Sequence, residues 1–131
     1  MSKQAKVVHF EVPADNMERA KKFYADVFGW EMPALDPVMK YQSVYTTKID
    51  EKRMPMEPGA INGGIIPRQA PMKYPVITLQ VDEIDAALES VEQNGGKVTM
   101  QKTPAGTMGF LAYFEDSEGN VMGLWQTTGG M

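Results

Sequence analysis

The chain has 131 residues, of which 43% are apolar, and it carries a formal net charge of -4 with no cysteine. This length predicts a single domain spanning residues 1–131, and the lack of cysteine excludes disulfides, thiolate nucleophiles and cysteine-based zinc or iron–sulfur sites. Lys and Arg are scattered along the chain and never form a run longer than two, so no basic stripe is present to neutralise phosphates, and we expect no nucleic-acid partner.

The sequence gives no signal for a membrane. No run of about 18 apolar residues occurs, and residues 1–6 lack the apolar segment of a signal peptide. We therefore expect a cytoplasmic protein without a membrane segment.

The first half of the chain predicts a strand, a helix and three further strands. Val7–Val12 is β-branched and aromatic, as strands are. Asp15 or Asn16 is an N-cap residue for an amphipathic helix that continues to Phe28 and ends at Gly29. The further strands are expected at Trp30–Leu35, Met39–Thr47 and Ala60–Ile66, with a polar, proline-rich loop at 48–58 before the last of them.

The second half repeats this order. A strand at Tyr74–Val81 precedes a helix from Ile84 to Val91 that ends at Gly95-Gly96. Three strands follow, at Lys97–Gln101, Met108–Glu115 and Val121–Gln126, with a hairpin turn at Asp116–Asn120 before the last. The pattern predicts two βαβββ units, at about residues 5–67 and 73–127, whose helices are offset by 67 residues.

Alternation along the first strand separates two faces. Val8, Phe10 and Val12 form an apolar face, whereas His9 and Glu11 lie on the other. The apolar face is expected to pack on the helix. His9 and Glu11 are then left on the opposite side of the sheet, where we place the candidate pocket.

The strands of the second half separate in the same way. Ile77, Leu79 and Val81 form the apolar face at residues 74–81, and Thr78 and Gln80 the opposite one. On the last strand, Gly123 and Trp125 are expected on the same side as Thr78. The predicted ligand-binding residues are Thr78, Gln80, Tyr45, Tyr113, Gly123 and Trp125.

His9 and Glu11 are the candidate catalytic residues. His9 is the only histidine, and its spacing of two from Glu11 brings both onto one strand face. The alternative is a structural pair, hydrogen-bonded to each other or to neighbours. Gly63-Gly64 fits a close approach of the backbone or a bulge, and lacks the lysine that follows a phosphate-binding loop.

Three segments together resemble the vicinal oxygen chelate, or glyoxalase/bleomycin resistance protein/dioxygenase, superfamily. They are Phe10–Asp15, Arg19–Tyr24 with Phe28-Gly29-Trp30, and Asp116–Asn120 followed by Gly123-Leu124-Trp125. The resemblance covers nearly the whole chain. It implies an α+β fold in which two tandem βαβββ units form a U-shaped mixed sheet, with helices on the outer face and the ligand inside.

Metal-using members of that superfamily hold a divalent cation with side chains that this chain lacks. The resemblance places the corresponding positions at Val7, Val76 and Gly123, none of which can donate an electron pair. The remaining position falls within Ala60–Gly64, where only Asn62 has a side-chain oxygen. Because a divalent site needs three or more N or O ligands, we expect no metal and predict no cofactor.

The resemblance leaves three functions open. The first is a metal-independent binding protein or enzyme for a small organic molecule, with lyase or isomerase activity among the options. The second is a metal-dependent lyase, isomerase or dioxygenase in which His9 and Glu11 form a shifted metal site. The third is a non-catalytic module that sequesters a ligand such as an antibiotic. The resemblance also implies a homodimer.

Overall fold

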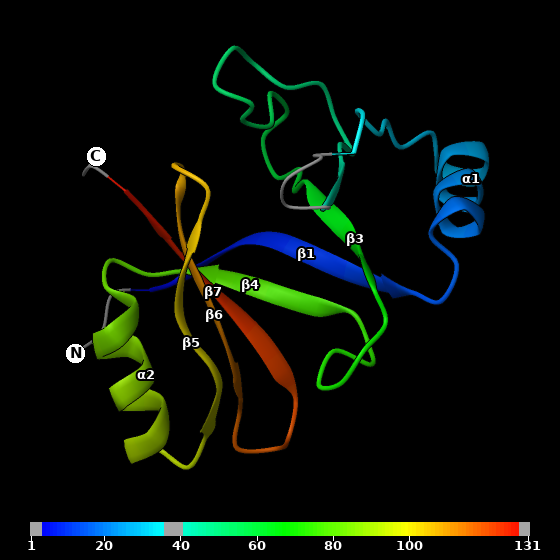
Figure 1. Cartoon of the computed structure of the whole chain (residues 1–131). Helices are drawn as coiled ribbons and strands as arrows, with labels where there is room; N and C mark the ends of the chain where they lie inside the picture. Colours follow the sequence, from blue (N-terminus) through cyan, green and yellow to red (C-terminus); the bar gives the residue numbers. More distant parts are fainter. Residues whose placement is uncertain (1–3, 36–40, 129–131) are drawn as a thin grey trace. The chain divides into compact units, whose positions relative to one another are not determined.

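The computed structural model of the chain describes residues 4–35 and 41–128 (Figure 1). These residues form an α+β fold with two helices and seven strands. The chain divides into two compact units, His9–Pro75 and Val76–Met131, and the residues before His9 are grouped with the second. The division at Pro75 lies close to the boundary between the predicted repeats.

The first unit contains a three-stranded mixed sheet and one helix. Its elements are β1 (Lys6–Ala14), α1 (Met17–Phe28), β2 (Gln42–Val44) and β3 (Gly63–Pro67). The middle strand, β3, pairs in parallel with β1 and antiparallel with β2. The sequence therefore predicted β1 and α1 correctly, and β2 and β3 within a few residues.

The ends of α1 follow from its capping residues. The Asn16 side chain accepts a hydrogen bond from the Arg19 backbone N–H at 2.9 Å, which satisfies one of the unpaired donors at the helix start. Gly29 has a φ of 72°, the left-handed conformation that ends helices and that glycine adopts without strain. Gly29 was the predicted end of the helix, and Asn16 was one of the two predicted N-cap candidates, the other being Asp15.

The expected strand at Trp30–Leu35 is wrong. Only Glu31 pairs there, in an isolated antiparallel bridge with Tyr45. Pro33 explains the loss because proline has no N–H to donate to a ladder, and its carbonyl instead accepts a hydrogen bond from the buried Gln42 side chain at 2.8 Å. The beginning of the predicted strand at Met39–Thr47 lies outside the described residues.

The second unit has the complete predicted order of elements. They are β4 (Val76–Gln80), α2 (Ile84–Gln93), β5 (Lys97–Ala105), β6 (Gly109–Glu115) and β7 (Val121–Thr127). Within this unit the strand order is β4-β7-β6-β5. The β4–β7 pair is parallel, and the other two are antiparallel.

Each helix packs on the face that alternation predicted, but Ile77, which was expected to pack there, is 46% exposed. In the first unit, Ala14, Val44 and Ile65 form a buried cluster against which Phe10 and α1 side chains pack. In the second, Ile84 and Leu88 of α2 are buried with residues of β6 and β7. Among the described residues, no helix is long and apolar enough to cross a membrane.

Candidate functional site

His9 and Glu11 lie on the face of β1 that is turned away from α1. Their neighbours Phe10 and Ala14 belong to the cluster packed on α1, and successive side chains of a strand point to opposite faces. The predicted orientation of both residues is therefore confirmed.

The His9 imidazole is half-buried and held by a tyrosine. Its Nε2 lies 2.6 Å from the Tyr41 hydroxyl, and the two rings are stacked at 26° with centroids 6.1 Å apart. Burial lowers the pKa of His9 to about 4 from its ordinary value of 6.5, because a charged imidazolium loses its hydration there. His9 is consequently neutral at pH 7 and can either donate or accept a proton.

Glu11 lies deeper, with 6% of its surface exposed. It is the register partner of Gly64 on β3, which is in turn the partner of Ser43 on β2. Register partners point to the same face of a sheet. One row across the three strands thus carries a carboxyl group, a position without a side chain and a hydroxyl group.

Gly64 has no room for a side chain. A Cβ at this position would lie 2.2 Å from the Tyr41 hydroxyl oxygen and 2.4 Å or less from two ring carbons. The prediction that Gly63-Gly64 permits a close approach of the backbone is confirmed for Gly63, where a Cβ would lie 2.3 Å from the Phe10 carbonyl oxygen. At Gly64 the approaching group is instead an aromatic side chain.

The sequence did not predict the pairing of Tyr41 with His9. Thirty-two positions separate the two residues, and only strand pairing through β3 brings their part of the sheet together. Gly64 is the sequence feature that indicates a close contact at this point, but a glycine alone does not identify which side chain occupies the space. Tyr45, which was predicted to bind ligand, follows β2, and its backbone bonds to Glu31 in both directions.

In the second unit, the predicted ligand-binding residues also share one face. Thr78 and Tyr113 flank Gly123 in register, and the next row along places Gln80 beside Trp125. The other face of β4, β6 and β7 packs against α2, with Leu79 and Leu124 in its cluster. Alternation therefore placed Thr78, Gln80, Gly123 and Trp125 correctly with respect to α2, and Tyr113, which was predicted only as an aromatic ligand contact, lies on the same face as these four.

The positions that the family resemblance assigns to metal ligands carry no donor side chain at Val7, Val76 and Gly123. Val7 and Val76 present hydrocarbon, and a Cβ at Gly123 would lie 2.6 Å from the Thr78 hydroxyl oxygen, so no longer side chain fits there. The Asn62 side-chain oxygen accepts hydrogen bonds from the backbone N–H and hydroxyl of Thr46, at 2.7 and 3.2 Å. Within residues 4–35 and 41–128, no three His, Asp or Glu side chains gather closely enough to hold an ion.

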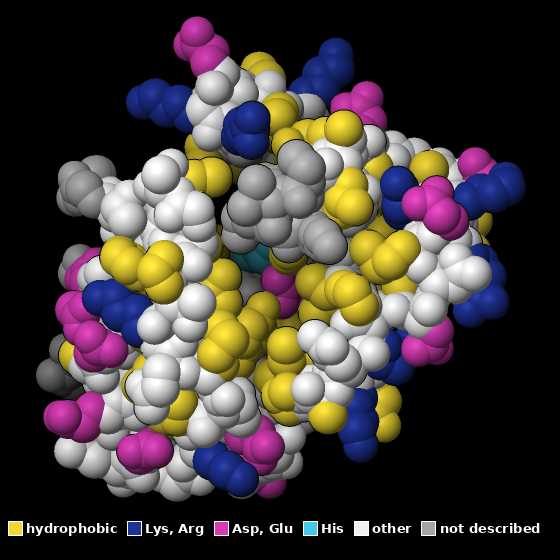
Figure 2. Space-filling view, in the orientation of Figure 1, with side chains coloured by type: hydrophobic (Ala, Val, Ile, Leu, Met, Phe, Trp, Pro, Cys, Tyr) yellow, Lys and Arg dark blue, Asp and Glu magenta, His cyan; other side chains and the backbone are white. Residues whose placement is uncertain are grey.

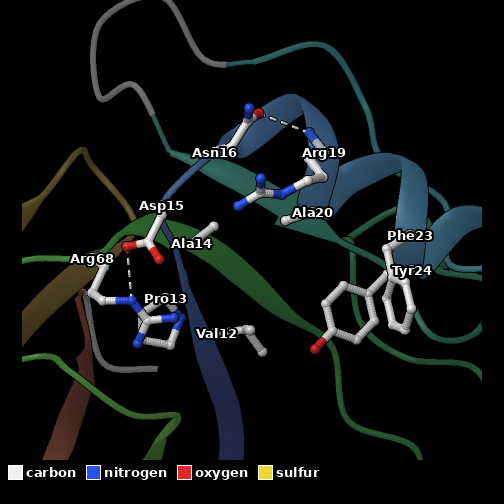
Figure 3. Close-up of a pocket in the computed structure, with 10 residues that line it drawn as sticks. All are labelled: Val12, Pro13, Ala14, Asp15, Asn16, Arg19, Ala20, Phe23, Tyr24 and Arg68. Carbon is white, nitrogen blue, oxygen red and sulfur yellow. Dashed lines mark hydrogen bonds and ion pairs between the residues drawn. The ribbon is translucent and has the colours of Figure 1, made fainter.

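A groove of about 310 Å³ lies on the α1 side of the first unit (Figure 3). Val12 and Tyr24 form part of its wall, and Arg19 and an Asp15–Arg68 ion pair of 2.9 Å lie along it. None of the predicted site residues lines this groove. It contains no acid–base pair comparable to His9 and Glu11, so we place the candidate site on the other face.

Comparison with known proteins gives one family. The sequence model of the Glyoxalase/Bleomycin resistance protein/Dioxygenase superfamily matches residues 6–124. A glyoxylase-like domain-containing protein of Didymella fabae is 31% identical over 118 residues, 85% of each chain. A lactoylglutathione lyase of Haemophilus influenzae is 28% identical over 116 residues, 86% of each chain.

Two further similarities concern a longer protein and a solved structure. The putative glyoxylase CFP32 of Mycobacterium tuberculosis is 31% identical over 121 residues, and the match covers 88% of this chain but 43% of that protein. A methylmalonyl-CoA epimerase solved with methylmalonyl-CoA and NH4+ has a TM-score of 0.62 at 14% identity, with 96% of each chain covered. The second similarity shows a shared fold.

Proposed function

Because this chain belongs to the glyoxalase/bleomycin resistance protein/dioxygenase superfamily, we propose that it binds a small organic molecule and transfers a proton in it without a divalent metal. The observation that carries this proposal is the pair on β1, a neutral imidazole and a buried carboxyl group two residues apart on one strand face. Proton transfer is the step that such a pair performs in lyases and isomerases.

The state of His9 suits this role at neutral pH. A neutral imidazole offers one N–H donor and one acceptor nitrogen, and Glu11 adds a second group that exchanges protons. Both lie out of bulk water, where hydrogen bonds to a ligand are stronger than on the surface. The fold-sharing epimerase binds a CoA ester, which supports a small organic molecule as the kind of ligand.

Metal independence rests on the chemistry of the positions themselves. The side chains of Val7 and Val76 have no donor atom, Gly123 has no side chain, and the Asn62 side-chain oxygen accepts hydrogen bonds from Thr46.

On the face shown in Figure 2, Lys and Arg side chains are interspersed with Asp and Glu. This mixed charge favours a small ligand over a polyanion as the partner.

The test is a thermal-shift screen of small oxo and hydroxy compounds, with methylmalonyl-CoA as the first probe and EDTA present throughout. A compound that binds should raise the melting temperature of the wild-type chain, because binding to the folded state alone stabilises it. The shift should disappear in the His9→Ala/Glu11→Ala double variant and persist in Tyr74→Phe, which alters a side chain 76% exposed.

Each outcome of this screen separates two functions. A shift of equal size in the double variant would reject the placement of the site. A hit that appears only when EDTA is replaced by Zn²⁺, Ni²⁺ or Mn²⁺ would favour the metal-dependent alternative. A hit that is recovered chemically unchanged after prolonged incubation would favour sequestration over catalysis.

A further inference from the structure

Tyr41 lies immediately before β2 and reaches His9 on β1 across the intervening strand β3. Its hydroxyl oxygen is 2.6 Å from Nε2 of the imidazole, a short distance within the range for a hydrogen bond. The two rings are nearly parallel, at 26°. Both the position and the tilt of the His9 ring are therefore defined by Tyr41.

Gly64 is required by this arrangement and by nothing in its own backbone. Several other glycines of the chain, such as Gly29 and Gly59, have a φ in the left-handed region, but Gly64 does not. Its Cβ position is instead occupied by Tyr41, whose hydroxyl oxygen, Cζ and Cε1 would lie 2.2 to 2.4 Å away. The missing side chain thus forms a slot through which the tyrosine crosses β3.

We propose that Tyr41 is the positioning residue of the candidate site, that Gly64 provides the slot for its ring, and that its hydroxyl holds His9 in the tautomer protonated at Nδ1. Only the statement that His9 then meets a ligand rests on the proposed function. The contact itself belongs to the free protein and can be tested without a ligand.

The tautomer of His9 decides which group donates in this contact. A neutral imidazole carries its proton on one nitrogen and accepts with the other. The pKa of His9, lowered to about 4 by burial, leaves the ring neutral at pH 7. A phenol hydroxyl can donate or accept, and in the proposed arrangement the Tyr41 O–H donates to Nε2, which places the ring proton on Nδ1.

The experiment uses the single histidine of the chain. In protein labelled with ¹⁵N-histidine, the two ring nitrogens give one pair of NMR signals, whose shifts report the tautomer. We expect the Nδ1–H form at pH 7 in the wild-type chain and a titration midpoint near 4. Among the described residues of the first unit, Glu11, Tyr41, Tyr45 and Glu31 are titratable side chains whose strand positions share this face, and Glu11 is two residues from His9, so the titration is read together with Glu11→Gln.

Two variants then separate the hydroxyl group from the ring. Tyr41→Phe keeps the ring and removes the hydroxyl, so the tautomer should change towards Nε2–H while the midpoint stays well below 6.5. Gly64→Ala displaces the ring, so the tautomer should change and the midpoint should rise towards 6.5. Tyr74→Phe, which removes an exposed hydroxyl, should leave both readings as in the wild type.

Gly64→Ala can also destabilise the fold, and a third variant covers that case. If the collision is with the Tyr41 ring, adding Tyr41→Ala to Gly64→Ala should restore the melting temperature to that of Tyr41→Ala alone. The proposal is overturned if Tyr41→Phe keeps the Nδ1–H signals, or if Gly64→Ala destabilises the Tyr41→Ala chain as much as the wild type. A failed ligand screen with these NMR results intact would reject the proposed function alone.

Discussion

The His9 imidazole is neutral because side chains alternate between the two faces of β1. His9 alternates with Phe10, so the packing of Phe10 towards α1 directs His9 to the face where Tyr41 covers it. Burial then lowers the pKa of His9 to about 4. A residue that would titrate near neutral pH in water is therefore uncharged over the physiological range.

This property predicts acid sensitivity. Between about pH 6.5 and 4 the unfolded chain binds a proton at His9 that the folded chain does not, so the free energy of unfolding decreases as the pH falls through that window. The contribution is complete above pH 6.5, and a pKa difference of about 2.5 corresponds to roughly 3 kcal/mol. Urea unfolding at pH 7 and pH 4.5 should show most of this loss in the wild type.

The matched control for this prediction is His9→Gln, which cannot titrate. Its free energy of unfolding should decrease less over the same interval, since only the carboxyl groups common to both chains contribute. Equal decreases in the two chains would contradict the assignment of a depressed pKa to His9.

Among the elements, those with a strong period or a local cap were predictable from the sequence. α1 and its Asn16 and Gly29 caps, and the strand-turn-strand around Asp116, match the structure. In the turn, the Asp116 carboxylate accepts hydrogen bonds from the Glu118 and Asn120 backbone, which lowers the pKa of Asp116. Such interactions join residues only a few positions apart, so the local residue pattern can predict them.

What could not be predicted depends on residues far apart. Pro33 interrupts a segment whose composition otherwise favours a strand, and the buried Gln42 side chain binds its carbonyl. Alternation gave the face of His9 and Glu11 because it needs only one strand. The contact of His9 with Tyr41 needs the register of β2, β3 and β1 together, and no local pattern encodes that register.

One long-range contact of this kind caps the N-terminus of α2. The Gln126 side-chain oxygen on β7 accepts a hydrogen bond from the Ile84 backbone N–H, the first of the helix, at 2.8 Å. Gln126→Leu should reduce the free energy of unfolding by about 1–2 kcal/mol because it leaves this N–H without an acceptor. Gln126→Glu retains an acceptor, and its negative charge is favourable at a helix start.

The measurement combines urea unfolding with hydrogen exchange at Ile84. The amide of Ile84 should exchange faster in Gln126→Leu and remain protected in Gln126→Glu. If both variants behave alike, the Gln126 side chain does not act as a cap.

At the scale of the whole molecule, the two repeats give helices that begin 67 residues apart, at Met17 and Ile84. They differ in what they expose. Phe23 and Val27 of α1 are 54% and 56% exposed, and the positions 67 residues later carry the polar residues Ser90 and Asn94. The first repeat has therefore acquired an apolar surface that the fold common to both repeats does not need, and such surfaces mark sites of association.

We propose that this surface of α1 contributes to a homodimer, the assembly that the family resemblance implies. Replacing Phe23 and Val27 by the residues of the second repeat, in Phe23→Ser/Val27→Asn, should weaken self-association by about 10- to 100-fold, because truncating an apolar anchor at an interface costs on the order of 1–3 kcal/mol. Light scattering at micromolar concentration should give a dimer mass for the wild type and a lower mass for the variant.

The control is Lys22→Ala, which changes an exposed α1 side chain and removes no apolar area. A monomer mass for the wild type would reject the dimer. A dimer that survives in Phe23→Ser/Val27→Asn would place its interface on another surface, because the side chains that distinguish α1 from α2 would then be dispensable.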